Sequence, residues 1–458
     1  LDNATVAPLN ALRINRFVLV NSVLYGIGTV SASDAHTQIW TKATATDLTS
    51  AWTAAGGTST SSSSVESNIL GVGYKNYIYG VDAGGVWKYG DVSGSPTFTY
   101  NDYTTNVPTA QGLVHSKDDI LYIPSGNKIL KNTDTAGTGW SVGLTLPTNS
   151  VSRSICEYGD YLAIACDQAD GSAVVYLWDR DSGLATLSVK IDWGFGSLKI
   201  IETIGGVLCG ISTSRSLGTI TALERLSFKY YSGNSVITFK EFACTALTIP
   251  PDGGGTNGGG LKQKFNDLFY FLAEATIHGV SMRGLWKIFK KPTGEMTVSF
   301  DILPRNDTAL SNGGLKGFIR IGDYIFISYL NPADTLETIW RTDDQANYLV
   351  TSIYESPLFN FGDASATKKL IGVTVMTTPL PTAGQIVLKY RKNEETSWTT
   401  IFTNTTDDSI SHSAINIESS GANFTEFKEI QFRIESYGGA EIIGFKFKAE
   451  FIDKDMYQ

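Results

Sequence analysis

The sequence predicts an all-β protein: a seven-bladed β-propeller over residues 1–355, followed by a small β-sandwich or jelly-roll domain over residues 356–458. Three observations support this fold class. Charged residues make up 18% of the chain, aromatic residues make up 11%, and glycines number 46, a mixture that favours strands and tight turns over helices. A short apolar motif recurs seven times before Glu355, and the recurrence then stops.

The recurring motif is a two-residue polar turn followed by three apolar residues, as in Lys75-Asn76 before Tyr77-Ile78-Tyr79. Asn, Asp and Gly tolerate a positive φ, so a polar pair between two apolar runs indicates a hairpin. The copies lie about 50 residues apart on average, which is typical of four-stranded propeller blades. The apolar triplets are residues 23–25, 77–79, 120–122, 161–163, 207–209, 268–270 and 324–326.

A second apolar element follows each triplet and often ends in tryptophan. A large ring packed between neighbouring sheets buries much area and fixes their stacking, which explains why this residue recurs. One blade cannot bury both of its faces alone, whereas a closed ring can. The predicted blade-core residues, of which the copy at Phe228 is degenerate, are Trp40, Trp87, Leu130, Trp178, Phe228, Trp286 and Trp340.

The two ends of the repeat array suggest how the ring closes. Blade 7 has a candidate fourth strand of its own near residues 348–350, which predicts closure by packing of blade 7 on blade 1. A strand shared through residues 1–9 is the alternative. The glycine-rich segment 250–260 lacks a following Gly-Lys-Ser/Thr, so it is interpreted as an insertion between blades 5 and 6, with a contact arm to a neighbouring subunit as the alternative.

The pattern changes at Ser356-Pro357, and about 100 residues follow without the repeat. Strand-like alternation recurs there in residues 370–375, 386–391, 398–402, 427–434 and 443–447. Five or more strands in this length predict a small sandwich or jelly roll.

Several short runs in this segment have a recognisable arrangement. They are Ser356-Pro357-Leu358-Phe359-Asn360-Phe361-Gly362-Asp363, Lys368-Lys369-Leu370, Pro379-Leu380-Pro381, Tyr390-Arg391 with Trp398, and Phe432-Arg433-Ile434. The arrangement resembles the C-terminal part of structural proteins in tailed bacteriophages, over residues 356–450, while the propeller resembles them by architecture alone. The resemblance implies a virion component of the tail, nozzle or baseplate, assembled in the host bacterial cytoplasm. It also implies contacts with other virion proteins, a homo-oligomeric ring that is often sixfold, and contact with host surface glycans.

No catalytic, metal or cofactor site is predicted. The sequence has no HExxH, no CxxC and no G-x-S-x-G, and its four histidines lie far apart. A net charge of −9 without a basic block disfavours non-specific nucleic-acid binding, and no specific nucleic-acid partner is expected. No apolar run approaches the roughly 20 residues of a membrane span. The cysteines are interpreted as buried free thiols, with a contact between Cys156 and Cys166 across one hairpin as the alternative.

Two functional hypotheses follow. The first is a non-enzymatic structural component of a bacteriophage tail, in which the propeller acts as a rigid interaction disc. The second is a glycan-binding or glycan-cleaving surface propeller for host attachment, in which exposed Tyr100, Tyr103 and Trp193 stack on sugar rings. The other interpretation of these three rings is that they fill gaps between blades. A protein-interaction propeller of the eukaryotic type is disfavoured, because regular Trp-Asp dipeptides are missing apart from Trp178-Asp179.

The glycan-cleaving hypothesis makes a specific demand on the arginines. Residues 133–140 are similar to one distorted copy of the turn that recurs in sialidases, which are propellers that bind a sugar carboxylate with three arginines. This resemblance implies that arginines converge on the propeller axis. The candidates are Arg13, Arg16, Arg153, Arg320 and Arg341.

Overall fold

The computed structural model consists of β-strands joined by turns and loops, with no helix among the residues it describes. Nothing in this part of the chain therefore has the form of an apolar helix long enough to cross a membrane. The described residues are 13–29, 37–42, 52–58, 70–82, 85–103, 114–115, 117–135, 139–181, 189–215, 224–249, 262–277, 280–291, 293–302, 315–322, 324–331, 336–341, 351–361, 363, 365–393, 395–415 and 426–452.

The chain divides into two compact units, an N-terminal unit of Asp2–Thr342 and a C-terminal unit that begins at Asp343. The boundary predicted after Glu355 therefore comes too late. Strand β28 (Thr351–Glu355), predicted within the repeat array, pairs instead with β33 (Ile430–Tyr437) of the C-terminal unit. The Ser356-Pro357 break misplaced the boundary because it follows the first strand of the second unit. The predicted strand near residues 348–350 lies outside the described residues.

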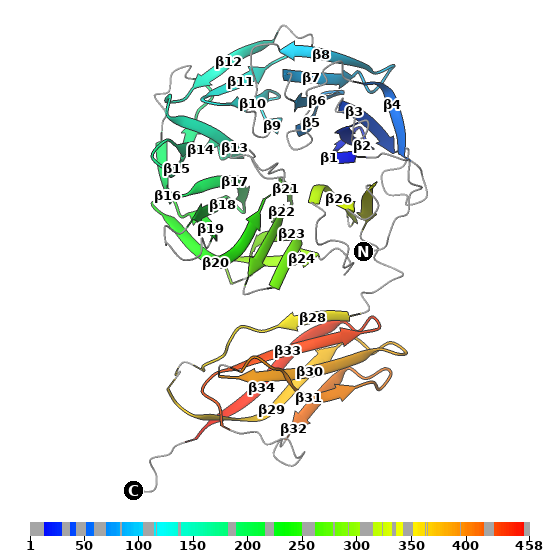
Figure 1. The fold of residues 1–458 in the computed structure, drawn as a ribbon, viewed down its shortest axis with the longest axis vertical. Coiled ribbons are helices and arrows are strands. Elements are labelled where there is room, and N and C mark those ends of the chain that lie inside the picture. The colour runs from blue at the N-terminus through cyan, green and yellow to red at the C-terminus, as the bar shows by residue number, and fades with distance from the viewer. Residues whose placement is uncertain are drawn as a thin grey trace. The chain divides into compact units, whose positions relative to one another are not determined.

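The strands of the N-terminal unit follow the sequence repeats, which are numbered 1 to 7 in chain order (Figure 1). Repeats 1 and 2 contain β1 (Arg13–Val20), β2 (Val23–Thr29), β3 (Thr37–Lys42), β4 (Trp52–Thr58), β5 (Leu70–Tyr74), β6 (Tyr77–Asp82), β7 (Gly85–Gly90) and β8 (Thr97–Tyr103). Repeats 3 and 4 contain β9 (Val114–His115), β10 (Leu121–Ser125), β11 (Lys128–Asn132), β12 (Trp140–Thr145), β13 (Ser150–Tyr158), β14 (Tyr161–Gln168), β15 (Ser172–Trp178) and β16 (Val189–Phe195).

The last three repeats complete this unit. Repeats 5 and 6 contain β17 (Ser197–Ile204), β18 (Val207–Arg215), β19 (Glu224–Tyr231), β20 (Val236–Thr248), β21 (Lys262–Phe265), β22 (Leu268–Ile277), β23 (Val280–Lys290) and β24 (Met296–Ile302). Repeat 7 contains β25 (Leu315–Ile321), β26 (Tyr324–Asn331) and β27 (Leu336–Arg341).

Each repeat is an antiparallel meander whose strands pair in chain order. Figure 1 shows the sheets arranged around a common centre in a propeller-like manner, with the first strand of each of repeats 1 to 6 toward that centre. Repeats 5 and 6 depart from the pattern, because β20 also pairs with β22 and joins them into one eight-stranded sheet. The glycine-rich segment 250–260 that connects these strands lies outside the described residues.

Most of the polar pairs that open the motif form the tight turns predicted for them, while Asp323 of the last pair lies outside the described residues. Asn21, Lys75 and Asn266 have φ values of 50°, 52° and 53°, and Gly159 and Gly322 have 59° and 58°. A left-handed residue at the turn matches the twist of the two strands it joins. The apolar triplet after the turn therefore starts the second strand of its repeat, except in repeat 3, where β10 begins one residue later, at Leu121.

Buried side chains join each of the first five repeats to the next. Ile27 and Ile39 of repeat 1 share a core with Trp87 of repeat 2, and Trp178 of repeat 4 shares one with Tyr122 of repeat 3. Further cores of this kind join repeats 2 and 3, repeats 4 and 5, and repeats 5 and 6. Burial of large apolar side chains is the main stabilising contribution of such junctions.

The first and last repeats also pack against each other. Ile14, Phe17 and Trp40 of repeat 1 lie in one buried cluster with Ile319 and Phe326 of repeat 7. Ser328 Oγ of repeat 7 donates a hydrogen bond of 2.6 Å to Ile14 O. Closure in the described part of the chain is thus by packing, while residues 1–9, the alternative closing strand, lie outside it.

The C-terminal unit contains two sheets with a common core. One sheet has the order β28-β33-β30-β31, where β30 is Gln385–Lys392 and β31 is Thr399–Asn404. The other has the order β32-β29-β34, formed by Ser411–Ile415, Lys368–Thr377 and Ile442–Phe451. Leu388 and Phe432 of the first sheet share a buried cluster with Val373 of the second.

Candidate functional site

The predicted blade-core residues lie on the third strand of each repeat, where most of them face the preceding repeat. Trp87 is an example: it pairs with Gly80, the residue that follows the triplet, and is fully buried. A Cβ on Gly80 would lie 2.0 Å from Trp87 Cζ2, so the indole lies directly over this glycine. Trp40, Leu130, Trp178 and Trp286 are buried as well. Trp340 pairs with Ile327, but its side chain is not described.

Repeat 5 breaks this rule at the equivalent position. Its triplet is also followed by a glycine, Gly210, but the cross-strand partner of Gly210 is Lys229. The indole over Gly210 comes from Trp193 of repeat 4, whose Cζ2 would lie 2.6 Å from a Cβ on Gly210. Trp193 is the extra residue of a β-bulge in β16, between Asp192 and Gly194. A bulge redirects a side chain, and here it turns the ring toward the next repeat.

The assignment of Phe228 as the blade-core residue of repeat 5 therefore needs correction. Phe228 is fully buried, but it pairs with Ile211 and packs toward repeat 6, where its ring lies 6.3 Å from that of Trp286. Successive residues of a strand point to opposite faces, so the face toward repeat 4 belongs to Lys229. Composition favoured the phenylalanine, whereas strand register selects the lysine.

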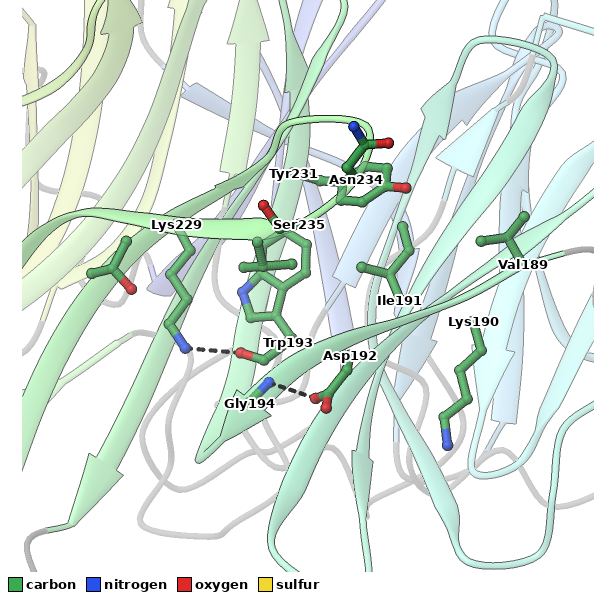
Figure 2. A pocket seen from close by; sticks show the side chains of 12 residues that line it. Val189, Lys190, Ile191, Asp192, Trp193, Gly194, Lys229, Tyr231, Asn234 and Ser235 are labelled. Carbon is green, nitrogen blue, oxygen red and sulfur yellow. Dashed lines mark hydrogen bonds between the residues drawn. The ribbon is translucent and has the colours of Figure 1, made fainter.

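A pocket of about 530 Å³ lies where the lysine replaces the indole. Strand β16 lines one side with residues 189–194, and the β19–β20 hairpin lines the other with Lys229, Tyr231, Asn234, Ser235, Val236 and Thr238. Figure 2 shows the labelled members of both groups around the pocket. Its volume falls in the range of about 300–1,000 Å³ that small-molecule sites occupy.

Lys229 is one of the three charged residues that line this pocket, together with Lys190 and Asp192. Its Nζ donates a hydrogen bond of 2.8 Å to Trp193 O, which uses one of three ammonium donors (Figure 2). Burial lowers the pKa of Lys229, while the charges of Glu241 and Asp192 act in the opposite direction. Glu241 is itself paired, since it accepts hydrogen bonds from Arg225 Nη1 at 2.7 Å and from Ser227 Oγ at 2.8 Å.

The remaining polar groups of the pocket are hydroxyl, amide and carboxylate groups. Asp192 Oδ1 accepts a hydrogen bond of 2.9 Å from Gly194 N, and the Tyr231 hydroxyl donates to Gly233 O. Lys190 is exposed, and it is the second lysine of the lining against one aspartate. The described lining is therefore polar and carries one net positive charge.

The three aromatic residues predicted as exposed glycan contacts have different outcomes. Trp193 is not exposed: its side chain is 1% accessible, and it fills the gap between repeats 4 and 5. Tyr100 and Tyr103 lie on β8, but their side chains are outside the described residues. The pocket beside Trp193 was not predicted, although the degenerate copy of the blade-core element at Phe228 was a signal that this repeat differs from the others.

The arginines considered for a sugar carboxylate lie at different junctions. Arg16 Nε bonds to Gly71 O at 3.3 Å, between repeats 1 and 2. Arg153 Nε bonds to Asp167 Oδ2 at 2.8 Å, and Asp167 Oδ1 accepts from Leu198 N of repeat 5 at 3.0 Å.

Arg320 Nη1 donates a hydrogen bond of 2.5 Å to the Tyr270 hydroxyl, between repeats 6 and 7. The described arginines of this set therefore do not converge, while the side chains of Arg13 and Arg341 are outside the described residues.

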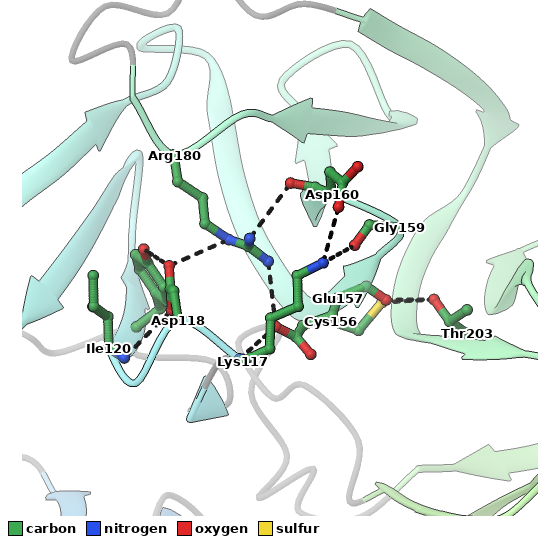
Figure 3. Close-up of polar contacts among 10 residues, drawn as sticks. Lys117, Asp118, Ile120, Cys156, Glu157, Gly159, Asp160, Arg180 and Thr203 are labelled. Carbon is green, nitrogen blue, oxygen red and sulfur yellow. Dashed lines mark hydrogen bonds and ion pairs between the residues drawn. The ribbon is translucent and has the colours of Figure 1, made fainter.

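A second charged cluster joins repeats 3 and 4 (Figure 3). Lys117 Nζ donates to Asp160 Oδ1 at 3.0 Å, and Arg180 Nη2 donates to Glu157 Oε1 at 3.3 Å. Arg180 Nε also lies 3.7 Å from Asp118 Oδ2. Lys117 of repeat 3 thus pairs with a carboxylate of repeat 4, and Arg180 of repeat 4 lies near a carboxylate of repeat 3. These ion pairs connect the two repeats, which is a structural role.

The described residues contain no cluster of three or more His, Cys, Asp or Glu side chains arranged to hold a metal ion. The four cysteines are free and buried. Cys156 pairs with Ala163 and Cys166 with Ser152, so the two thiols are not partners across the hairpin. Burial raises the pKa of Cys156 and of Cys209 to about 12.

Comparisons with known proteins give structural likenesses at low sequence identity. No protein-family model and no curated protein matches the chain. The structure of YjhT has 10% identity and a TM-score of 0.42, with 64% of this chain and 99% of that chain covered. BamB from Moraxella catarrhalis has 11% identity and a TM-score of 0.37, with coverages of 73% and 84%. The β-propeller domain of the trilobed protease from Pyrococcus furiosus has 10% identity and a TM-score of 0.41, with coverages of 74% and 97%.

Proposed function

We propose that the chain is a non-enzymatic structural component of a bacteriophage particle, located in its tail as a nozzle, minor tail or baseplate protein. In this proposal the seven repeats are the blades of a propeller that acts as a rigid disc, and the two C-terminal sheets form a sandwich that docks it. The resemblance of residues 356–450 to tail, nozzle and baseplate proteins is the basis for the virion assignment.

One observation carries the structural role: a polar contact joins every pair of successive repeats, including the last and the first. The seven contacts, with atom separations of 2.5 to 3.5 Å, are Asn21–Asn76, Lys75–Asp119, Lys117–Asp160, Glu157–Thr203, Glu202–Lys262, Tyr270–Arg320 and Ser328–Ile14. Close-packed junctions fixed by directional bonds transmit strain rather than absorb it. Such a disc suits a particle component that holds its partners at fixed positions.

The proposal includes the assembly that the resemblance implies. Copies of the chain would form a ring around the tail axis, with sixfold symmetry as the first expectation, and would contact other virion proteins. The chain would act in the virion after assembly in the host bacterial cytoplasm.

The experiment is a cryo-electron microscopy map of the phage that encodes this chain, together with mass spectrometry of purified particles. We expect the chain among the virion proteins, with density for both units in a ring on the tail. Particles of normal composition that lack the chain and its density would contradict the proposal.

Host-glycan binding is the second candidate function, and the polar pocket beside Trp193 favours it. A glycan array combined with a hydrolysis assay tests it. Binding of a glycan without its cleavage would support a host-attachment role. Cleavage of any polysaccharide would overturn the non-enzymatic assignment.

A further inference from the structure

The pocket between repeats 4 and 5 occupies the one described position where the repeat replaces a buried ring by a cation. Equivalent positions carry Trp40, Trp87, Leu130 and Trp286 in repeats 1, 2, 3 and 6, and all four side chains are buried. Repeat 5 has Lys229 at this position. The indole that packs over Gly210 comes from Trp193 of the preceding repeat. Positions that break an otherwise consistent local rule are expected at functional sites.

We propose that this pocket binds an acidic sugar, whose carboxylate pairs with the Lys229 ammonium and whose hydroxyls bond to the polar lining. This inference deepens the glycan-binding candidate and rests on it, and it is independent of the virion proposal.

The carboxylate follows from the state of the Lys229 ammonium. Its Nζ donates a hydrogen bond of 2.8 Å to Trp193 O, which holds the positive charge at a fixed place in the pocket. Burial lowers its pKa, which means that the ammonium has lost hydration. Glu241 is already bonded to Arg225 and Ser227, and Asp192 is bonded to Gly194 N. An anionic group of a ligand would restore the interactions that a partly desolvated ammonium lacks.

The sugar follows from the rest of the lining. Asn234, Ser235, Thr238 and Asp192 supply amide, hydroxyl and carboxylate groups, which donate to and accept from sugar hydroxyls. Val189 and Val236 supply apolar carbon for the faces of a pyranose ring. The lining carries two lysines against one aspartate, so its net charge is one positive, and Lys229 is the lysine held by a hydrogen bond to the pocket wall. One net positive charge matches one carboxylate on a polyhydroxylated ring better than a multiply charged phosphate ester.

The geometry also explains why the site can be specific without an exposed aromatic ring. Trp193 forms the buried floor, because its side chain is 1% accessible, and its main-chain carbonyl fixes Lys229. The bulge at Trp193 thus positions both the floor of the pocket and its cation. Pre-positioned groups lose little conformational entropy on binding.

The test is isothermal titration calorimetry of the full chain at low salt with oligogalacturonate, neutral oligogalactose and inorganic phosphate. We expect oligogalacturonate to bind and the other two to bind at least about tenfold more weakly, as loss of a charged hydrogen bond predicts. Lys229→Met should weaken oligogalacturonate about tenfold or more and Lys229→Arg should retain it, because only the latter keeps the charge. Lys240→Met is the matched control, since Lys240 is an exposed lysine of β20 outside the pocket, and it should leave binding unchanged.

Three outcomes would overturn the inference. Equal binding of oligogalactose and oligogalacturonate, unaffected by Lys229→Met, would leave glycan binding intact but contradict the acidic specificity. Tighter binding of phosphate than of oligogalacturonate would identify an anion site rather than a sugar site. Binding of no saccharide would contradict both the inference and the glycan-binding candidate, and would leave the virion proposal standing. Asn234→Ala, a change in an exposed turn, gives a second variant should Lys229→Met fail to fold.

Discussion

Repeats 2 and 5 solve the same packing problem with residues from different places. Both have a glycine after the apolar triplet, and both place the Cζ2 edge of an indole over it. In repeat 2 the indole is Trp87, on the cross-strand partner of Gly80. In repeat 5 it is Trp193, from the outer strand of the preceding repeat, and the cross-strand partner of Gly210 is Lys229.

The difference shows how one junction of a repeat protein can hold a pocket without losing its core. When the neighbour supplies the ring, the local position is released from packing and can carry a charge. The pocket beside Lys229 is the space that results. Measurements on the two repeats should therefore separate packing, which is shared, from charge, which is not.

Replacement of either indole should have the largest effect. Trp193→Ala and Trp87→Ala should each lower the free energy of unfolding by about 3–5 kcal/mol, because each leaves a cavity over a glycine. Phe195→Ala is the control on the same strand, where the ring is 79% exposed, and it should cost less than about 0.5 kcal/mol. Urea denaturation measures the free energy of unfolding of all three variants. If Trp193→Ala lowered it as little as the control does, Trp193 would not have the packing role of Trp87.

Filling the glycines should have the next largest effect. Gly80→Ala and Gly210→Ala each add a methyl group against an indole, and overpacking of this kind costs about 1–3 kcal/mol. The cost should be greater at Gly80, where the nearest indole atom is 2.0 Å from the added carbon, than at Gly210, where it is 2.6 Å. Thermal unfolding of both variants gives the order, and the reverse order would argue against the indole positions.

Thiol reactivity should show whether the junction between repeats 4 and 5, where Trp193 packs over Gly210, is as tightly packed as the other junctions. Cys156 and Cys209 are buried in repeats 4 and 5, and burial raises the pKa of each to about 12. The reactive thiolate is therefore scarce at pH 8, and labelling by iodoacetamide should be negligible until the chain unfolds. Fast labelling in the native state, followed by mass spectrometry, would show that this junction opens.

The smallest expected effect concerns pH and the C-terminal unit. His412 is buried with its Nε2 2.9 Å from Thr377 Oγ1, and burial lowers its pKa below the ordinary 6.5. The unfolded chain then binds a proton more readily than the folded one, so stability is complete above pH 6.5 and declines as pH falls below it. His412→Gln should flatten this slope in unfolding curves between pH 7.5 and about 5.5. An unchanged slope would show that other groups cause it.

The sequence allowed much of the strand pattern to be predicted, because its signals are local. A polar pair with a left-handed residue followed by an apolar triplet is sufficient to locate a hairpin, and Gly159 and Asn266 adopt the positive φ that this requires. The burial of Trp87 and Trp286 also followed from their recurrence. These features depend on residues that are neighbours along the chain.

The parts that were missed depend on register between strands. Phe228 and Lys229 are adjacent, and only pairing with Ile211 and Gly210 decides which of them faces repeat 4. The role of Trp193 depends on a bulge in β16, and the union of repeats 5 and 6 depends on pairing of β20 with β22. The first strand of the C-terminal unit was misplaced because its partner, β33, is distant in sequence.

The central claim is that Trp193 of repeat 4 packs over Gly210 of repeat 5, and a double-mutant cycle tests it most directly. The cycle combines Gly210→Ala with Trp193→Leu and measures the free energies of unfolding of all four proteins. If Trp193 lies over Gly210, the added methyl group should cost about 1–3 kcal/mol in the parent and much less once the indole is gone, giving a coupling of at least about 1 kcal/mol. Additive effects, with a coupling within about 0.5 kcal/mol of zero, would contradict the account.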